Sequence, residues 1–548
     1  MLYRRLAVPN LTLAFALLLG LLVGATVLPH AAQAQTLPTY RIDATLDVDG
    51  AALRARQVVS FKNAVGKPLE SAVFRAYPSI VGGLRLESSA VDSQAREARI
   101  DGSVLEVPLG APLAPGSSTE IELRYAINLP RRAERLSDTP RAVALGSWYP
   151  ILAVHRGDWD RRQFVDVGDA FFSAAADYDV TITTSRPLEL AATGQLVERD
   201  DLRWRFIAHG VRDFAIAGST GYAVRSVQTG ATTVNAYALT AARAQQWAES
   251  GADLVSWYGE HFGAYPYPSL AIAEVDLPAS YGGLEYPALV MLSAQIGAPA
   301  GLDFLLAHEI AHQWFYSWVG NDQIADPWLD EALATYVPVL YYAEVRPDLV
   351  QGVLDRSVTG GAAEREARAG GGPVDSSIND FSSDGPYFTI VYRKGARFLD
   401  ALRGRLGDTA FGELLRSYVA TYHDHVASPR AFLDLAQSAT SANLNPLFAE
   451  FFSYAAFRYP TPQAWTLETP PGPWRGSAYL FVGADFPVTQ VELWLDDRLL
   501  ASGPQNAVTV DLSGVEPGEY VLLARVWNHE GVIFERARRV AVAFNPSL

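Results

Sequence analysis

Residues 302–318 read LDFLLAHEIAHQWFYSW, an apolar stretch with helical spacing that carries two histidines and a glutamate. His308 and His312 are four residues apart, so on a helix their imidazoles share one face and Glu309 projects beside them. Zinc accepts neutral nitrogen and carboxylate ligands in a tetrahedron, and a catalytic zinc keeps one position open for water. The spacing therefore predicts two ligands of one zinc ion, which needs a third ligand from elsewhere in the chain.

A second predicted helix offers that third ligand. Glu331 follows His312 with eighteen residues between them. The gap is long enough for the first helix to end near residues 319–321 and for a second to begin near Pro327 and return past the metal. A chance His-Glu-x-x-His string would bring no correctly spaced carboxylate with it, so we expect Glu331 to complete the site.

Composition restricts the remaining choices. The 548 residues contain no cysteine, which excludes thiolate ligands, disulfides and a cysteine nucleophile. The hydrophobic share of 49% and charged share of 19% are typical of globular proteins. A formal charge of −16 and the lack of a long Lys/Arg run argue against nucleic acid or an anionic membrane surface as the main partner.

The amino-terminal segment predicts export. Arg4 and Arg5 precede an apolar run over residues 11–28, which ends in Ala32-Gln33-Ala34. This is the pattern of a signal peptide over residues 1–34, cleaved before Gln35. The run is also long enough for an uncleaved membrane anchor, so membrane association through this segment stays open. In either case the rest of the chain is expected outside the cytoplasm, as a secreted, periplasmic or anchored protein.

Four further segments are expected, which gives a multidomain α+β fold. Short alternating stretches over residues 35–228 predict an all-β domain. Helical spacing over residues 241–262, a strand over residues 270–275 and two more helices over residues 302–318 and 328–342 predict an α/β domain over residues 229–345.

The last two segments are a helical lobe and a β module. Residues 346–460 return to helical spacing, interrupted by a glycine-rich stretch over residues 360–373, for which we expect a mobile loop and no helix. A proline-rich linker followed by alternating strands over residues 461–548 predicts a C-terminal Ig-like β-sandwich. This module is a candidate for binding a surface or a partner.

Four short stretches make the chain resemble the aminopeptidase N family of gluzincin zinc metallopeptidases. They are Gly-Gly-Leu-Glu-Tyr-Pro at residues 282–287, the histidine motif at residues 308–314, and residues 328–336 and 391–396. Residues 211–215 are also typical, and order and spacing agree from about residue 40 to 460. The resemblance implies a thermolysin-like catalytic domain with one zinc ion held by His308, His312 and Glu331, acting on peptides with a free amino terminus.

The same resemblance implies roles in bond cleavage. Glu309 corresponds to the general base, which takes a proton from the attacking water and passes it to the leaving amine. Tyr392 corresponds to the tyrosine whose hydroxyl stabilises the negative charge that develops on the substrate oxygen. Tyr387, five residues earlier, is the alternative. Asp326 is a candidate for orienting a ligand histidine, or for capping the helix that begins near Pro327.

Substrate binding is also implied by the resemblance. Glu285 corresponds to the glutamate that binds the free α-amino group, with Gly283 and Tyr286 beside it in the same segment. A second amine anchor from the N-terminal domain has two candidates, Asp169 and Asp177.

The chain also departs from the family pattern. Tyr286 stands where asparagine is usual, Leu284 where methionine is usual, and Pro338 replaces a carboxylate. The large C-terminal helical domain of the longer members gives way to the predicted sandwich. Two alternatives remain beside an aminopeptidase: a zinc endopeptidase of the same clan, which would have no use for Glu285, and a non-catalytic peptide-binding protein on this scaffold.

Overall fold

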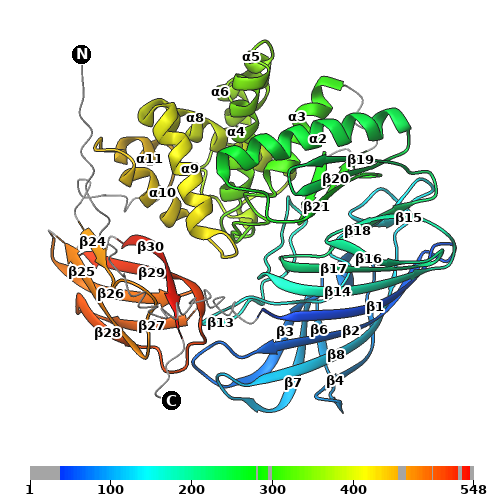
Figure 1. The fold of residues 1–548 in the computed structure, drawn as a ribbon, viewed down its shortest axis with the longest axis horizontal. Coiled ribbons are helices and arrows are strands. Elements are labelled where there is room, and N and C mark those ends of the chain that lie inside the picture. Colours follow the sequence, from blue (N-terminus) through cyan, green and yellow to red (C-terminus); the bar gives the residue numbers. More distant parts are fainter. Residues whose placement is uncertain are drawn as a thin grey trace, which may run out of the picture.

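A computed structural model of the chain describes residues 37–278, 282–293, 299–368, 370–453, 465–484, 486–496, 498–528 and 533–543. It confirms the multidomain α+β fold, with an N-terminal β domain, a central α/β region, a helical part and a C-terminal β module (Figure 1). The predicted signal peptide at residues 1–34 and the linker around residues 460–462 lie outside the described residues. In the ranges given above, no helix combines the length and apolar character needed to cross a bilayer.

The N-terminal domain is built on an eight-stranded sheet. Its strand β1 alternates exposed and buried residues without exception, which places one face against the core and the other in solvent. In spatial order the strands are β16 (Gln195–Arg199), β17 (Arg203–Val211), β14 (Ala176–Thr184), β1 (Thr39–Asp47), β2 (Ala52–Lys62), β8 (Ser118–Asn128), β4 (Arg85–Val91) and β5 (Gln94–Ala95).

Smaller sheets complete this domain. One joins β15 (Glu189–Ala192), β18 (Ile216–Ser219), β10 (Val143–Leu145) and β9 (Leu136–Asp138), and another joins β11 (Ile151–Leu152), β3 (Leu69–Arg75), β7 (Val104–Leu113) and β6 (Arg99–Asp101). The remaining elements are α1 (Pro78–Val81) and the pair β12 (His155–Arg156) and β13 (Asp158–Trp159).

The central domain has a five-stranded mixed sheet in the order β19 (Ala223–Thr229), β20 (Thr232–Ala238), β21 (Ser269–Val275), β23 (Leu289–Ser293) and β22 (Gly283–Tyr286). Because β19 pairs with β20, this sheet begins slightly before the predicted boundary at residue 229. The helix α2 (Ala241–Phe262) starts where Thr240 accepts a hydrogen bond from the Arg243 amide and ends at Gly263, whose φ of 120° favours glycine.

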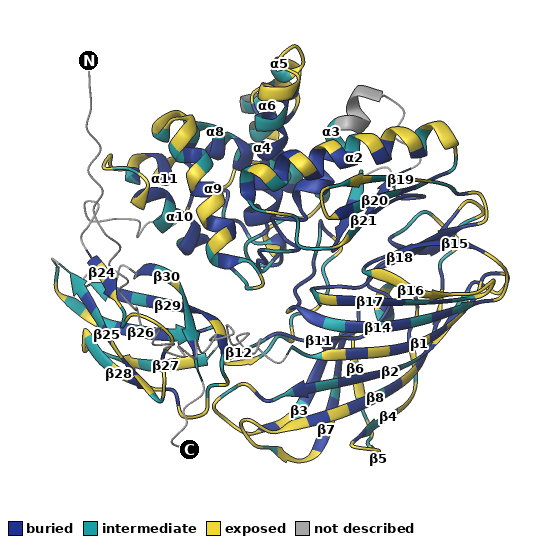
Figure 2. Ribbon diagram, viewed as in Figure 1, coloured by how far each residue is buried: buried dark blue, intermediate teal, exposed yellow. Residues whose placement is uncertain are grey.

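Two more helices follow, α3 (Pro299–Ala311) and α4 (Trp328–Val345). The hydroxyl of Tyr258 on α2 donates to the carbonyl of Ala307 at 2.9 Å, which fixes α3 against α2. α4 is buried from Trp328 to Val339, in line with its almost continuous apolar sequence, and its last turn is exposed (Figure 2).

The helical part corrects one prediction. A short helix, α6 (Ala362–Arg368), lies within residues 360–373, where a loop without helix was expected. Its Ala, Glu and Arg residues are strong helix formers, and the glycines confine rather than prevent it: Gly370 and Gly371 follow with positive φ. The other elements are α5 (Val350–Ser357), η1 (Ile378–Asp380), α7 (Asp384–Tyr387), the π-helix η2 (Phe388–Lys394), α8 (Gly395–Leu406), α9 (Asp408–Tyr422), α10 (Pro429–Ser438) and α11 (Asn445–Phe451).

The C-terminal module consists of two antiparallel sheets, β24 (Trp465–Glu468), β25 (Ser477–Ala484) and β28 (Ala507–Asp511), and β27 (Arg498–Gly503), β26 (Val488–Leu495), β29 (Gly518–Asn528) and β30 (Ile533–Val542). It packs on the helical part rather than standing apart (Figure 1). Ser428 at the start of α10 donates to the buried carboxylate of Glu535 on β30 at 2.5 Å, and His425 lies 3.0 Å from Asp496.

Candidate active site

The helix that carries the histidines is shorter than predicted. It ends at Ala311 instead of near residue 318, because the amides of Gln313 and Trp314 bond to carbonyls three residues back and tighten the last turn. His312 therefore lies just beyond α3. Its amide still bonds to the carbonyl of His308 at 3.3 Å, so the four-residue spacing keeps both imidazoles on one side.

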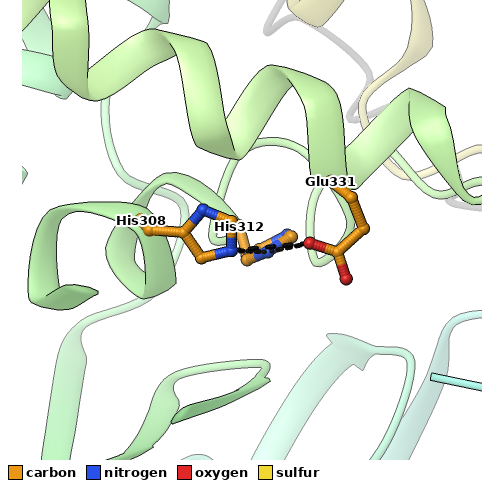
Figure 3. A group of neighbouring side chains, drawn as sticks. All are labelled: His308, His312 and Glu331. Carbon is orange, nitrogen blue, oxygen red and sulfur yellow. Dashed lines mark hydrogen bonds and ion pairs between the residues drawn. The ribbon is translucent and has the colours of Figure 1, made fainter. Parts of the chain in front are cut away.

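Three donor atoms converge where the sequence predicts a metal (Figure 3). The two Nε2 atoms of His308 and His312 are 3.1 Å apart, and Oε2 of Glu331 lies 3.4 Å and 3.2 Å from them. Ligands at about 2.0–2.1 Å from a tetrahedral zinc lie about 3.3 Å from one another. All three side chains are buried, so this predicted site has the donor set and the spacing for zinc.

The outer nitrogens of both rings have partners. Nδ1 of His312 is 3.1 Å from the carbonyl oxygen of Phe315, and Nδ1 of His308 is 3.5 Å from the hydroxyl of Thr335. Such contacts direct Nε2 towards the metal. Asp326 was predicted either to orient a ligand histidine or to cap α4, and its position fits neither role. Pro327 occupies the N-cap of α4, and among the described residues no hydrogen bond joins Asp326 to a ligand histidine. Thr335 follows Glu331 by one helical turn on the same face, a spacing that could have revealed it.

Glu309 lies against β22. A Cβ added to Gly283 would come 2.5 Å from the carboxyl carbon of Glu309, so only glycine permits this approach. Burial, reinforced by the carboxylates of Glu331 and Asp169, raises the pKa of Glu309 to about 8. For Glu331 burial acts in the same direction, but the two imidazoles outweigh it and lower its pKa to about 2.

Further carboxylates adjoin the ligands. Carboxylate oxygens of Asp169, Glu285 and Glu331 all lie within 4.8 Å of one another. Burial and the charge of Asp169 raise the pKa of Glu285 well above its usual value. The structure thus brings Asp169 into the site, held by the guanidinium of Arg135 at 3.0 Å. It leaves Asp177 outside the cavity lining, on β14, where its carboxylate accepts from the amide of Gly210.

Strand alternation separates the residues of the 282–287 segment. Gly283 and Glu285 are two residues apart on β22 and both line the cavity. Tyr286 points to the opposite face, into an apolar cluster that includes Leu289 and Met291. The prediction of Tyr286 as a substrate-binding residue is therefore not matched by its position, and its side chain stabilises the sheet instead.

Two glutamines that the sequence reading missed position these groups. Gln313 donates to the carbonyl of Tyr286 at 3.0 Å and accepts from the amide of Ala288 at 2.8 Å, which fixes β22 to the end of α3. Gln323 donates to Glu285 at 3.2 Å and to Asp330 at 2.7 Å. Neither is recognisable from spacing alone, since each acts through a loop conformation.

Arg212 lies in residues 211–215, the segment that is also typical of the family resemblance, and it links two domains. Its guanidinium donates to the carbonyl of Tyr316 at 3.1 Å and to that of His425 at 2.6 Å. One buried side chain of the N-terminal domain thereby holds the turn after His312 and the helical part together.

Tyr392 reaches the ligands from the π-helix η2. Its hydroxyl donates to Oε1 of Glu331 at 2.6 Å, and its ring stacks on His308 with centroids 5.7 Å apart. Tyr387, the alternative, is fully buried and its ring lies against the backbone of Gly168. The structure therefore favours Tyr392. π-helical turns are frequent at functional sites because they re-aim a side chain.

These groups surround a cavity of about 480 Å³, within the range of pockets that enclose small ligands. Asp169, Glu285 and the zinc-binding residues line it together with apolar side chains that include Phe304, Leu305 and Phe388. The cavity therefore combines a predicted metal site, three further carboxylates (Asp169, Glu285 and Glu309) and apolar walls.

Comparison with known proteins agrees with this geometry. A model of the peptidase family M1 domain matches residues 248–451. Aminopeptidase M1-A of Oryza sativa subsp. japonica is 28% identical over 179 residues, which cover 30% of this chain and 20% of the relative. Aminopeptidase N of Lactobacillus helveticus is 31% identical over 184 residues, which cover 31% of this chain and 21% of the relative. The matched part thus spans about a fifth of these relatives.

Solved structures extend the likeness of the fold. The M1 zinc metallopeptidase of Deinococcus radiodurans superposes with a TM-score of 0.55 at 22% identity, covering 76% of this chain and 92% of that one. A mutant of it bound to a Tyr-Ser-Ala substrate gives 0.56 at 22% identity, covering 78% and 96%. Fold and site together define a gluzincin-type zinc peptidase domain. The peptidase M1 domain match over residues 248–451, together with the aminopeptidase N relatives, supports the aminopeptidase N family for this part of the chain.

Proposed function

We propose that this protein is an exported, zinc-dependent aminopeptidase that removes single residues from the amino ends of peptides. The observation that carries the proposal is the pair of carboxylates, Asp169 and Glu285, beside the zinc-binding cluster. Buried carboxylates that raise one another's pKa are stabilised by a cation, and the ammonium group of an unblocked peptide supplies one. An endopeptidase would have no such requirement.

The residues of the cavity divide the reaction among them. A zinc ion held by His308, His312 and Glu331 would supply Lewis acidity towards water and the scissile carbonyl. Glu309 accepts the proton of the attacking water and returns it to the leaving nitrogen as the C–N bond breaks. Tyr392 donates a hydrogen bond to the carbonyl oxygen as negative charge develops there. Asp169 and Glu285 hold the ammonium, so the first peptide bond is the one presented.

Export is proposed from the amino-terminal segment alone. The Arg4-Arg5 pair, the apolar run and the Ala32-Gln33-Ala34 ending have the pattern of a signal peptide, which supports this part of the proposal. The mass of the mature protein tests it: a chain that begins at Gln35 is expected, and a full-length chain recovered from the cytoplasm would contradict export.

The function is tested with an unblocked and an N-acetylated aminoacyl anilide. Acetylation removes the ammonium that Asp169 and Glu285 bind, and the loss of one partner of a buried charge pair costs about 2–5 kcal/mol. The acetylated substrate should therefore be cleaved at least about 30-fold more slowly, measured as kcat/KM. The Glu285→Gln variant should cleave the unblocked anilide roughly 10–100-fold more slowly than the wild type.

The exposed Glu249→Gln on α2 is the matched control and should behave as wild type. Equal cleavage of blocked and unblocked substrates would favour the endopeptidase instead. A chain that carries zinc but cleaves neither substrate would favour the non-catalytic binding protein.

Tyr392→Phe should lower kcat by roughly 10²–10³-fold with little change in KM, because the lost hydrogen bond acts mainly on the developing charge. Tyr387→Phe is the comparison, since it removes a buried hydroxyl that has no hydrogen-bond partner among the described residues. Steady-state kinetics on the unblocked anilide decide between them. If Tyr387→Phe proves inactive and Tyr392→Phe does not, the two assignments must be exchanged.

A further inference from the structure

The cavity that contains the carboxylates is also lined by two arginines. Arg356 comes from the last turn of α5 and Arg393 follows Tyr392 on η2. Arg365, on α6, lies near Arg393, and α6 packs against η2. Arg356 and Arg393 thus lie on the helical side of a cavity that is also lined by four carboxylates, with Arg365 close to Arg393.

These arginines differ from the basic residues around them. Lys394 and Arg397 both pair with the carboxylate of Glu366. Within the described part of the chain, the guanidinium groups of Arg356 and Arg393 form no ion pair or hydrogen bond, and Nε and Nη2 of Arg365 are buried without a partner. Burial and the charge of Arg365 lower the pKa of Arg393 below its usual value. Like charges held together without counter-ions indicate a site for an anion.

The chemistry of a short peptide matches this distribution of charge. A dipeptide or tripeptide carries an ammonium at one end and a carboxylate at the other, and each residue spans at most about 3.6 Å. With the ammonium at Asp169 and Glu285, the terminal carboxylate stays within about 11 Å, inside a cavity of about 480 Å³. A guanidinium binds a carboxylate through two parallel hydrogen bonds, which is the geometry that Arg offers and Lys does not.

We propose that Arg393, assisted by Arg356, binds the free C-terminal carboxylate of the substrate, and that the preferred substrates are unblocked dipeptides and tripeptides. This inference rests on the proposed aminopeptidase function and adds the length and the carboxyl end of the substrate. Arg365 contributes positive charge behind Arg393 rather than a contact of its own.

The test compares Leu-Gly-Gly with its C-terminal amide, using purified zinc-loaded enzyme. The wild type should cleave the free acid at least about 10-fold more efficiently than the amide, because a charge-assisted hydrogen bond contributes a factor of about 10–100. In Arg393→Gln this ratio should fall towards one, and Arg393→Lys should be intermediate. Since the ratio is measured within each variant, a general loss of activity cancels.

Two further variants keep the test decisive. Arg356 is exposed on α5, so its replacement does not disturb the core. The Arg356→Gln variant should lower the acid-to-amide ratio less than Arg393→Gln does. Arg405→Gln, exposed on α8 and outside the cavity, should keep the wild-type ratio. A wild type that cleaves acid and amide equally would overturn the carboxylate site and leave the aminopeptidase intact. If the wild type cleaves neither, the proposed function falls and this inference falls with it.

Discussion

Replacing Glu309 by glutamine should leave about one zinc ion per chain in place and lower kcat on an unblocked substrate by roughly 10²–10⁴-fold. Glu309 is not among the three donors that converge on the predicted metal, so its charge is not needed to hold the ion. A carboxamide has nearly the shape of a carboxylate and fits beside Gly283, but it cannot accept the proton of the attacking water.

Elemental analysis and steady-state kinetics on the same preparation measure both quantities. Near wild-type turnover with zinc bound would remove Glu309 from the role of general base. Loss of zinc together with turnover would mean that the variant disturbs the ligands, and the role of the base would then have to be tested with Glu309→Asp, which keeps the carboxylate but shortens its reach.

The periodicity of apolar residues along the sequence was enough to predict the regular helices and strands. The helix α2 matches the expected range of residues 241–262, and the alternating segments of the N-terminal domain form its sheets. The end of α3 could not be read in the same way, because residues 313–318 continue the apolar pattern while the backbone turns. Tyr316 has a φ of 132° there, and Arg212 from another domain holds its carbonyl. Tertiary contacts, not propensity, end this helix.

The candidate site divides in a similar way. The residues that were predicted from their spacing along the chain, His308, His312 and Glu331, come together in the structure. Residues that depend on the relative placement of domains did not follow from spacing: the sequence offered Asp169 and Asp177 equally, and only the fold brings Asp169 to the metal ligands. Tyr286 was misplaced because strand alternation turns it away from Glu285, which a motif match alone does not consider.

The carboxylates of the cavity link metal binding to substrate binding. Glu285, Glu309 and Asp169 are held close together, and burial raises the pKa of each. Such a cluster is destabilising by itself, since each carboxylate disfavours the charge of the others. Zinc at one side and a substrate ammonium at the other would offset that repulsion. Substrate and metal binding are therefore expected to depend on the same few carboxylates.

The choice of third ligand is open to a direct test on α4. Glu331→Ala should reduce bound zinc from about one ion per chain to near zero after dialysis, and hydrolysis should fall to background. Two imidazoles alone do not make the three-ligand set of a catalytic zinc site. The hydroxyl of Tyr392 would also lose its acceptor, so a moderate decrease in stability, about 1–3 kcal/mol, is expected in thermal unfolding.

Glu344→Ala provides the matched control on the same helix. Its side chain is 61% exposed and, among the residues that the structure describes, pairs only with His261 at 3.3 Å, a surface contact of little energetic weight. This variant should keep zinc and activity. Two carboxylates lie close enough to replace Glu331: if Glu331→Ala retained zinc at wild-type affinity, Asp169 or Glu285 would have to be the ligand, and the one that binds zinc could not then serve as an amine anchor. The zinc content of one variant therefore tests the metal site and the assignment of the substrate's amino end together.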